Sequence, residues 1–172
     1  FIRLEFDKVY DGMLASPMKV RDLLLGEILW AGTKGLFFSL SVLAILLPFG
    51  ILVHPATLFA GLTGFFTGLL FASFSLFITS FVKNINHFNF YMTGFLSPMF
   101  FFSGVFFPLG NLPGWLQTLA EVLPLTHSVR LTRGLITLNL NSGHIYDALY
   151  ILAFTALAAY AGIRRLSKRM ID

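Results

Sequence analysis

The chain has 172 residues, of which 56% are hydrophobic and only 12% are charged, whereas a soluble domain usually has about 25% charged residues. This composition excludes an ordinary soluble domain and predicts an all-α membrane protein, because long uncharged stretches are typical of segments that face lipid. Cysteine is absent, which excludes disulfides and thiolate metal sites. The net charge of +4 is better explained by basic cytoplasmic loops than by nucleic-acid binding.

Residues 1–34 form a region that is too charged to cross a bilayer. Apolar residues of its first part fall on one face of a helix, namely Phe6, Val9, Tyr10, Met13 and Leu14. Ser16-Pro17 then predicts the start of a second helix, which runs toward Trp30. We expect both helices at or beneath the cytoplasmic membrane surface. The amphipathic helix either lies flat on the bilayer or docks on a cytoplasmic partner.

Four stretches are long and apolar enough to serve as transmembrane helices, namely residues 35–53, 56–82, 88–107 and 145–163. Pro48 is expected to kink the first of them. Lys34, at the start of this first span, is expected to extend toward the headgroups. No charged residue falls in the middle of a predicted span, and this argues against a proton-coupled carrier.

The second predicted span carries a small residue at every fourth position. These residues are Ala60, Gly64, Gly68 and Ala72. Residues four apart share one face of a helix, and small side chains let a second helix approach closely within lipid. The stripe therefore predicts a helix-packing surface.

Residues 111–140 are too apolar for a free loop and too short for two further spans. Pro113–Leu123 and Thr126–Leu138 each have the length of a short helix, with Pro124 between them. We expect this pair of helices to re-enter the outer face of the membrane, where protein or water satisfies the broken backbone.

Arg130 and Arg133 lie three residues apart and therefore share one helix face. They either contact an anionic substrate or lipid headgroup at the outer face, or simply extend to lipid phosphates. Three aromatic residues nearby are typical interfacial anchors, namely Trp115, Tyr146 and Tyr150. Asp147 is expected to be solvated at the mouth of the last helix.

The distribution of basic residues predicts the orientation of the chain. Of the 12 Lys and Arg residues, all but Arg130 and Arg133 lie on one side of the predicted membrane, and the basic tail at residues 164–172 is among them. Such an excess marks the cytoplasmic side. Both ends of the chain are therefore expected in the cytoplasm, which requires an even number of spans.

No catalytic or cofactor-binding motif is present in the sequence. Gly32-Thr33-Lys34 lacks the preceding glycine of a phosphate-binding loop, and neither H-E-x-x-H nor G-x-S-x-G occurs. The four histidines lack metal-ligand spacing and are expected in interfaces or loops, namely His54, His87, His127 and His144. An intramembrane enzyme would need an acid, base or nucleophile on one face, and none is placed there. The sequence predicts a non-enzyme without bound cofactor or metal.

Two parts of the sequence together resemble the permease subunit of ABC-2 type exporters. The first comprises residues 10–17 (YDGMLASP) and 25–34 (LGEILWAGTK). The second, more specific part comprises residues 101–109 (FFSGVFFPL), 111–113 (NLP) and 123–128 (LPLTHS), followed by Arg130 and Arg133-Gly134. The resemblance covers nearly the whole chain. It is similar in particular to the branch that exports lipo-oligosaccharides, the nodulation factors.

The resemblance implies that residues 1–172 are a fragment of one six-helix permease domain, holding the last four spans and lacking the first two. It implies a cytoplasmic coupling helix, whose contacts with an ABC ATPase subunit would include Tyr10, Met13 and Leu14. ATP and magnesium would be bound by that ATPase and not by this chain. It further implies a second permease copy, membrane lipids as surroundings, and the bacterial cytoplasmic membrane as location.

The resemblance leaves the cargo open. An amphiphilic lipo-oligosaccharide is the leading expectation, and a hydrophobic drug or a polysaccharide is the alternative within the same family, because a fold does not determine its substrate. A non-transport membrane scaffold or insertion factor is a further alternative. The broken helical pair expected at residues 111–140 argues against a passive anchor of that kind.

Overall fold

The computed structural model describes residues 12–13, 17–50, 54–82 and 84–171, and helices make up nearly all of them. No strand occurs in this described part, which confirms the predicted all-helical class. The elements in chain order are α3 (Val20–Leu46), the short helical turns η1 (Leu47–Phe49) and η2 (Pro55–Phe59), α4 (Ala60–Thr79), α5 (Ile85–Tyr91), the π-helical turn η3 (Met92–Leu96), α6 (Ser97–Phe102), η4 (Leu109–Asn111), α7 (Gly114–Val122), α8 (Pro124–Thr137) and α9 (Ser142–Ile171).

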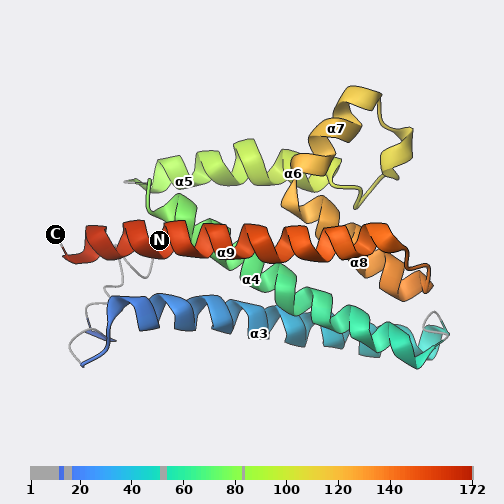
Figure 1. The fold of residues 1–172 in the computed structure, drawn as a ribbon, viewed down its shortest axis with the longest axis horizontal. Coiled ribbons are helices and arrows are strands. Elements are labelled where there is room, and N and C mark those ends of the chain that lie inside the picture. Colours follow the sequence, from blue (N-terminus) through green and yellow to red (C-terminus); the bar gives the residue numbers. More distant parts are fainter. Residues whose placement is uncertain (1–11, 14–16, 51–53, 83, 172) are drawn as a thin grey trace.

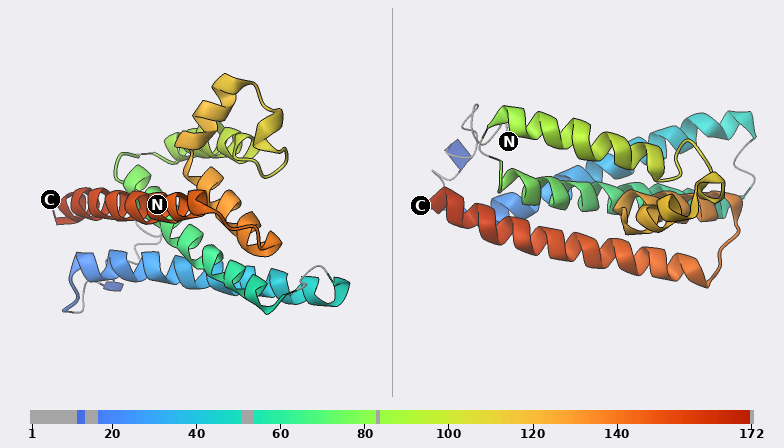
Figure 2. Two further views of the ribbon diagram at one scale, coloured as in Figure 1. Left: turned by 45° about the vertical axis from the view of Figure 1, so that its right-hand side comes forward. Right: turned by 90° about the horizontal axis from the view of Figure 1, so that it is seen from above.

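Three helices of the described chain are long and apolar enough to cross a membrane, over Val20–Phe49, Thr57–Thr79 and Ser142–Lys168. α4 lies between α3 and α9 and packs against both (Figures 1 and 2). α3 begins and α9 ends at one end of the molecule, whereas α7 and α8 lie toward the other (Figure 1). We call the first the basic end and the second the distal end. The basic residues at the basic end include Lys19, Arg21, Arg164, Arg165 and Lys168.

α3 runs without a break from Val20 to Leu46 and thus passes through the expected boundary at residue 34. The structure therefore differs from the expectation of a separate surface helix followed by a span from residue 35. The two pieces join because no proline between Val20 and Leu46 removes a helical N–H. Pro48 does not kink the helix; it lies in the short turn that follows its end.

Lys34 consequently lies near the middle of α3. Its side chain is exposed, and its Nζ lies 5.8 Å from the centre of the Trp30 ring, one turn closer to the basic end. α3 has 27 residues and is therefore about 40 Å long, more than the hydrocarbon core of a bilayer requires. The expectations that Lys34 extends toward the headgroups and that no charge lies in the middle of a span stay predictions, as does the argument against a proton-coupled carrier.

The third predicted span corresponds to α5, the π-helical turn and α6, which together end at Phe102, short of residue 107. This stretch is not among the three helices named above, because it begins with polar residues such as His87 and Asn89. Pro98 has no N–H for the carbonyl four residues earlier, and the wider π-helical turn lies immediately before it. A fourth spanning helix stays a prediction.

The two short helices expected between residues 111 and 140 correspond to α7 and α8. Pro124 separates them as expected, because it is the first residue of α8, where a missing N–H breaks no helical hydrogen bond. Their entry into the outer face of a membrane stays a prediction.

Glycines bring the three long helices into close contact. A Cβ atom added at Gly68 of α4 would lie 2.7 Å from the carbonyl oxygen of Ala31 in α3. Gly64, one turn away, faces α3 in the same way, and a Cβ atom at Gly162 of α9 would lie 2.9 Å from the backbone nitrogen of Phe77 in α4. Backbone groups cannot move aside as a flexible side chain can. These contacts therefore depend on glycine.

A cluster of buried apolar residues lies at the basic end. It is formed by Leu23, Leu24 and Ile28 of α3 together with Ile163 and Leu166 of α9. Leu24 and Leu166 are almost wholly buried, whereas large apolar side chains farther along α3, such as Phe37, stay exposed. An exposed apolar surface of this extent suits contact with lipid or with another membrane helix.

Candidate functional site

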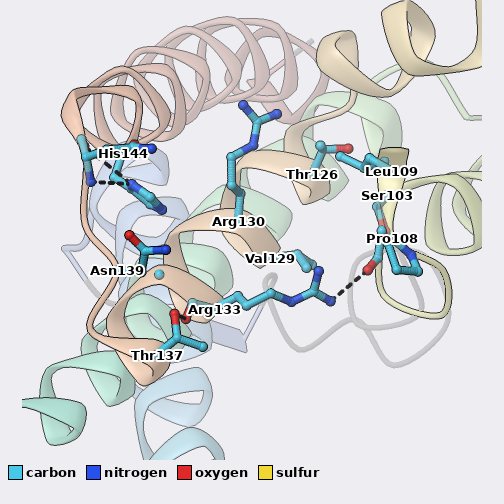
Figure 3. Close-up of a pocket in the computed structure, with 13 residues that line it drawn as sticks. Ser103, Pro108, Leu109, Thr126, Val129, Arg130, Arg133, Thr137, Asn139 and His144 are labelled. Atoms are coloured by element: carbon cyan, nitrogen blue, oxygen red, sulfur yellow. Dashed lines mark hydrogen bonds between the residues drawn. The ribbon is translucent and has the colours of Figure 1, made fainter. Parts of the chain in front are cut away.

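A polar cavity of about 290 Å³ lies at the distal end, between α8, the loop after α6 and the turn that leads into α9 (Figure 3). We call it the distal cavity. The residues that line it are Ser103, Gly104, Pro108, Leu109, Thr126, Val129, Arg130, Arg133, Gly134, Thr137, Asn139, Asn141 and His144. Two of them are arginines and none is acidic, so the lining is cationic.

The turn between α8 and α9 closes one side of the distal cavity. Leu138 ends α8 with a φ of 55°, a left-handed conformation that usually favours glycine or asparagine. The backbone N–H of Asn139 then donates to the carbonyl of Gly134, 3.1 Å away. This tight turn sends α9 back along α8 and brings its first residues beside the cavity.

His144, near the start of α9, lies directly against Gly134 of α8. A Cβ atom at Gly134 would collide with the His144 ring at Nε2. The backbone N–H of Asn141 donates to Nδ1 of the same ring at 3.1 Å, which fixes the ring orientation. A side chain at position 134 would therefore have to displace the His144 ring from this side of the cavity.

Beside the cavity, His127 of α8 and Asp147 of α9 form a fully buried pair. Both side chains are 0% exposed, and Nδ1 of His127 lies 2.6 Å from Oδ1 of Asp147. The expectation that Asp147 is solvated is therefore wrong. α8 covers it, because the tight turn places α8 and α9 side by side.

Both ring nitrogens of His127 have a polar partner. Nδ1 faces Oδ1 of Asp147 in α9, and Nε2 lies 2.9 Å from the carbonyl oxygen of Glu121 in α7. The ring is thereby held between α7 and α9.

Arg130 extends this pair into a network of four residues. It forms an ion pair with Glu121, and its guanidinium lies 3.6 Å from Oδ1 of Asp147. The carbonyl of Glu121 that faces Nε2 of His127 lies in the last turn of α7. The network ties α7, α8 and α9 together.

Tyrosines from α9 cover this network. The Tyr150 ring stacks on His127 with centroids 4.0 Å apart, and its hydroxyl donates to the carbonyl of Val122 at 2.7 Å. Tyr150 therefore has a direct packing partner in addition to any interfacial role. Tyr146 also meets the His127 ring edge-on, with centroids 5.8 Å apart. Tyr146 and Trp115 are both exposed, and their role as interfacial anchors stays a prediction.

Arg133, the second expected arginine, is placed differently from Arg130. Its guanidinium donates to the carbonyl oxygen of Gly104 at 3.0 Å, and no acidic residue of the described chain forms an ion pair with it. Gly104 has a φ of 85°, and this left-handed turn directs its loop toward α8. The structure thus brings both arginines to one cavity but gives a carboxylate partner only to Arg130.

The other expected site residues lie away from the distal cavity. Tyr10 and Leu14 are outside the described residues, and Met13 is 43% exposed. In the small-residue stripe, Ala60 is buried and Ala72 packs against the apolar cluster at the basic end, while the two glycines contact α3 as described above. Their roles in coupling and assembly stay predictions.

The described part of the chain contains no group of three or more His, Cys, Asp or Glu residues that could hold a metal ion. The His127–Asp147 pair is the feature that sequence reasoning missed. The two residues are 20 positions apart on different helices, so neither periodicity nor motif spacing connects them. The sequence feature that could have indicated this pair is the segment Leu138–Asn141, which is so short that α8 and α9 must lie close together.

Comparisons with known proteins agree with the resemblance of the sequence. The family model described as ABC-2 type transporter matches residues 1–137. A protein of Sinorhizobium fredii named Nodulation protein J is 29% identical over 172 residues, covering 100% of this chain and 66% of that protein. Its namesake in Rhizobium meliloti is 31% identical over 161 residues, covering 94% of this chain and 59% of that protein.

A more distant relative is named differently. A probable multidrug ABC transporter permease of Escherichia coli K12 is 28% identical over 164 residues, covering 90% of this chain and 44% of that protein. The chain thus spans less than two thirds of the length of these relatives. No solved structure matches it.

Proposed function

Because the chain belongs to the ABC-2 type transporter family, we propose that it forms part of the membrane-spanning permease of an ATP-driven exporter. The proposed cargo is an amphiphilic, lipo-oligosaccharide-like molecule that moves outward across the bacterial cytoplasmic membrane. The family match over residues 1–137 carries the proposal, and the relatives named Nodulation protein J favour this cargo over others.

The permease acts with a separate ABC ATPase subunit, which binds ATP and magnesium and hydrolyses the nucleotide. The coupling contact lies near Tyr10, Met13 and Leu14, within a segment from Glu5 to Leu25 that receives the push when the ATPases close. Such coupling requires the ATPase to bind two permease conformations with different affinity. The continuity of α3 from Val20 to Leu46 supports this role, because one rigid helix joins that segment to the membrane.

The same proposal places both chain ends in the cytoplasm and the distal cavity at the outer face. The basic residues near the start of α3 and the end of α9 support this orientation, since both lie at the basic end (Figure 1). Export is then from the basic end toward the distal end, along an interface between two permease copies. Arg130 and Arg133 lie where cargo leaves.

A hydrophobic drug is the second candidate cargo, and the similarity to the probable multidrug permease of Escherichia coli favours it. A polysaccharide is a further candidate. The exposed apolar surface along α3 suits either amphiphilic or hydrophobic cargo and does not separate them. The alternative to any export function is a membrane scaffold subunit that transports no cargo.

The test is export by the full-length protein in inverted membrane vesicles, together with the ATPase encoded nearest to it. Labelled lipo-oligosaccharide, a hydrophobic dye and a polysaccharide are offered separately, with and without ATP. ATP-dependent accumulation of the lipo-oligosaccharide inside the vesicles is expected. Accumulation of only the dye or the polysaccharide would reject the proposed cargo. A full-length protein that purifies under gentle conditions without any ATPase would reject the exporter itself.

A further inference from the structure

We propose that the distal cavity binds a single phosphate or carboxylate group of an anionic amphiphile, with Arg133 as its main cationic contact. Arg130 also lines the cavity, but it already pairs with Glu121. The inference rests on the proposed function only in placing this cavity at the outer membrane face.

The charge balance around the cavity is the first argument. Arg130 pairs with Glu121 and also lies 3.6 Å from Oδ1 of Asp147. Among the described residues, no carboxylate forms an ion pair with Arg133. Arg133 is therefore the cationic group of the cavity that lacks an acidic partner there, and an anion is the ligand that would supply one.

The donors of Arg133 are the second argument. A guanidinium has five N–H donors. In the structure the guanidinium of Arg133 donates one hydrogen bond, to the carbonyl of Gly104. This bond holds the side chain across the rim of the cavity, while the guanidinium of Arg130 points in a different direction (Figure 3). Phosphate and carboxylate oxygens match the planar fork of donors that remains.

An unpartnered polar group in the cavity wall is the third argument. Thr126 lines the cavity and is 0% exposed, yet its hydroxyl has no hydrogen-bond partner in the structure. A buried hydroxyl without a partner is unfavourable, so such groups usually meet a protein atom, a water or a ligand. Asn139 and Asn141 add neutral polar groups that suit the hydroxyls of a headgroup or sugar.

The surroundings of the cavity indicate that the anion belongs to a lipid-like molecule. Trp115 on α7 is 66% exposed, and Leu119 and Val122 continue an exposed apolar stripe one and two turns along that helix. Phe106 and Phe107, in the loop that leads to the cavity wall, are also exposed. Tryptophan and other aromatic residues favour the depth of lipid headgroups. The cavity is therefore at the level where the phosphate of an amphiphile lies.

The test measures binding and needs no ATP. Full-length protein in phosphatidylcholine nanodiscs is titrated with short-chain phosphatidylglycerol, and bound lipid is counted by native mass spectrometry. Replacing Arg133 by Gln is expected to weaken phosphatidylglycerol binding about tenfold, the loss of one charge-assisted contact. Arg133→Lys keeps the charge but loses the fork of donors. Its affinity for phosphatidylglycerol should therefore lie between the affinities of the original protein and of Arg133→Gln. Lys168→Gln, which removes a positive charge from the basic end, serves as the matched control and should leave binding unchanged.

Inorganic phosphate as a competitor distinguishes the two sources of the anion. Displacement of phosphatidylglycerol by phosphate would show that the anionic group alone is recognised. Failure to displace it, with the dependence on Arg133 intact, would show that the attached lipid is recognised as well. Both results support the site.

Equal binding of phosphatidylglycerol by the original protein and by a folded Arg133→Gln variant would overturn the proposal. Binding of phosphatidylcholine as tight as that of phosphatidylglycerol would overturn it as well. If Arg133→Gln does not fold, the affinity of Arg133→Lys for phosphatidylglycerol alone decides: a value equal to that of the original protein would overturn the proposal. Because no nucleotide or transport step is measured, a negative result leaves the proposed exporter function standing, and failure of the exporter function leaves this binding test valid.

Discussion

Gly68 provides the most direct test of the packing between α3 and α4. A Cβ atom at this position would lie 2.7 Å from the carbonyl oxygen of Ala31 and 3.0 Å from Cα of Gly32, both backbone atoms of α3. Real Cβ atoms do not approach other atoms so closely, so Gly68→Ala must push the two helices apart. Overpacking of this kind costs about 1–3 kcal/mol.

Gly26→Ala is the matched control, because a Cβ atom at Gly26 of α3 meets nothing within 4 Å. Both variants replace a helical glycine by alanine and gain the same helix propensity, about 1 kcal/mol. The difference between their free energies of unfolding therefore isolates the steric term. Equilibrium unfolding in mixed detergent micelles is the assay, and Gly68→Ala is expected to be less stable than Gly26→Ala by about 1–3 kcal/mol.

A Gly68→Ala protein as stable as the Gly26→Ala control would refute the reasoning. It would mean that α3 and α4 do not meet at Ala31 and that the small-residue stripe faces lipid. Gly68→Leu extends the test to function, since a larger side chain at the same place should also impair assembly and transport. Gly68→Ala tests for a local adjustment of the packing, whereas Gly68→Leu tests for loss of the contact between α3 and α4.

Three further outcomes are expected. Replacing Asp147 by Ala leaves Nδ1 of the buried His127 without its partner and should lower the free energy of unfolding by about 1–3 kcal/mol. A double variant that lacks both side chains should recover part of this loss, and equal losses in thermal or denaturant unfolding would contradict the interaction. Gly134→Ala should displace the His144 ring from the distal cavity, visible as a changed imidazole signal by NMR, and an unchanged signal would count against the contact. Met13→Glu should impair retention of the ATPase in a pull-down, and normal retention would remove Met13 from the coupling surface.

The helices were largely predictable from the sequence, because apolar length and proline positions act locally. Pro124 separates α7 from α8 and starts the latter, as a residue without an N–H does most easily at a first helical position. The all-helical class follows from the composition alone. These features depend on neighbouring residues along the chain, which a sequence displays directly.

The length of α3 was harder to predict, since charge suggested a boundary where the backbone has none. Lys34 marks a polar position, but a single lysine inside an apolar helix does not interrupt its hydrogen bonds, so the helix continues. Charge shows where a membrane surface is expected, whereas proline and capping residues show where a helix ends. The two signals diverge in this segment.

The distal network was not predictable because its members are joined only by tertiary structure. His127 and Asp147 meet through the turn after Leu138, and Tyr150 stacks on the His127 ring. The sequence does place Arg130 and Arg133 on one helix. It does not reveal that one of them is neutralised by Glu121 while the other faces the cavity.

The continuity of α3 has a mechanical consequence. The helix is held at several places along its length: Ala31 and Gly35 meet the glycines of α4 near its midpoint, and Leu23, Leu24 and Ile28 are packed against α9 and α4 at the basic end. A sideways displacement of its first turns therefore cannot occur in α3 alone. It has to carry the adjoining parts of α4 and α9 with it, so the three long helices are expected to respond to a push at the basic end as one body.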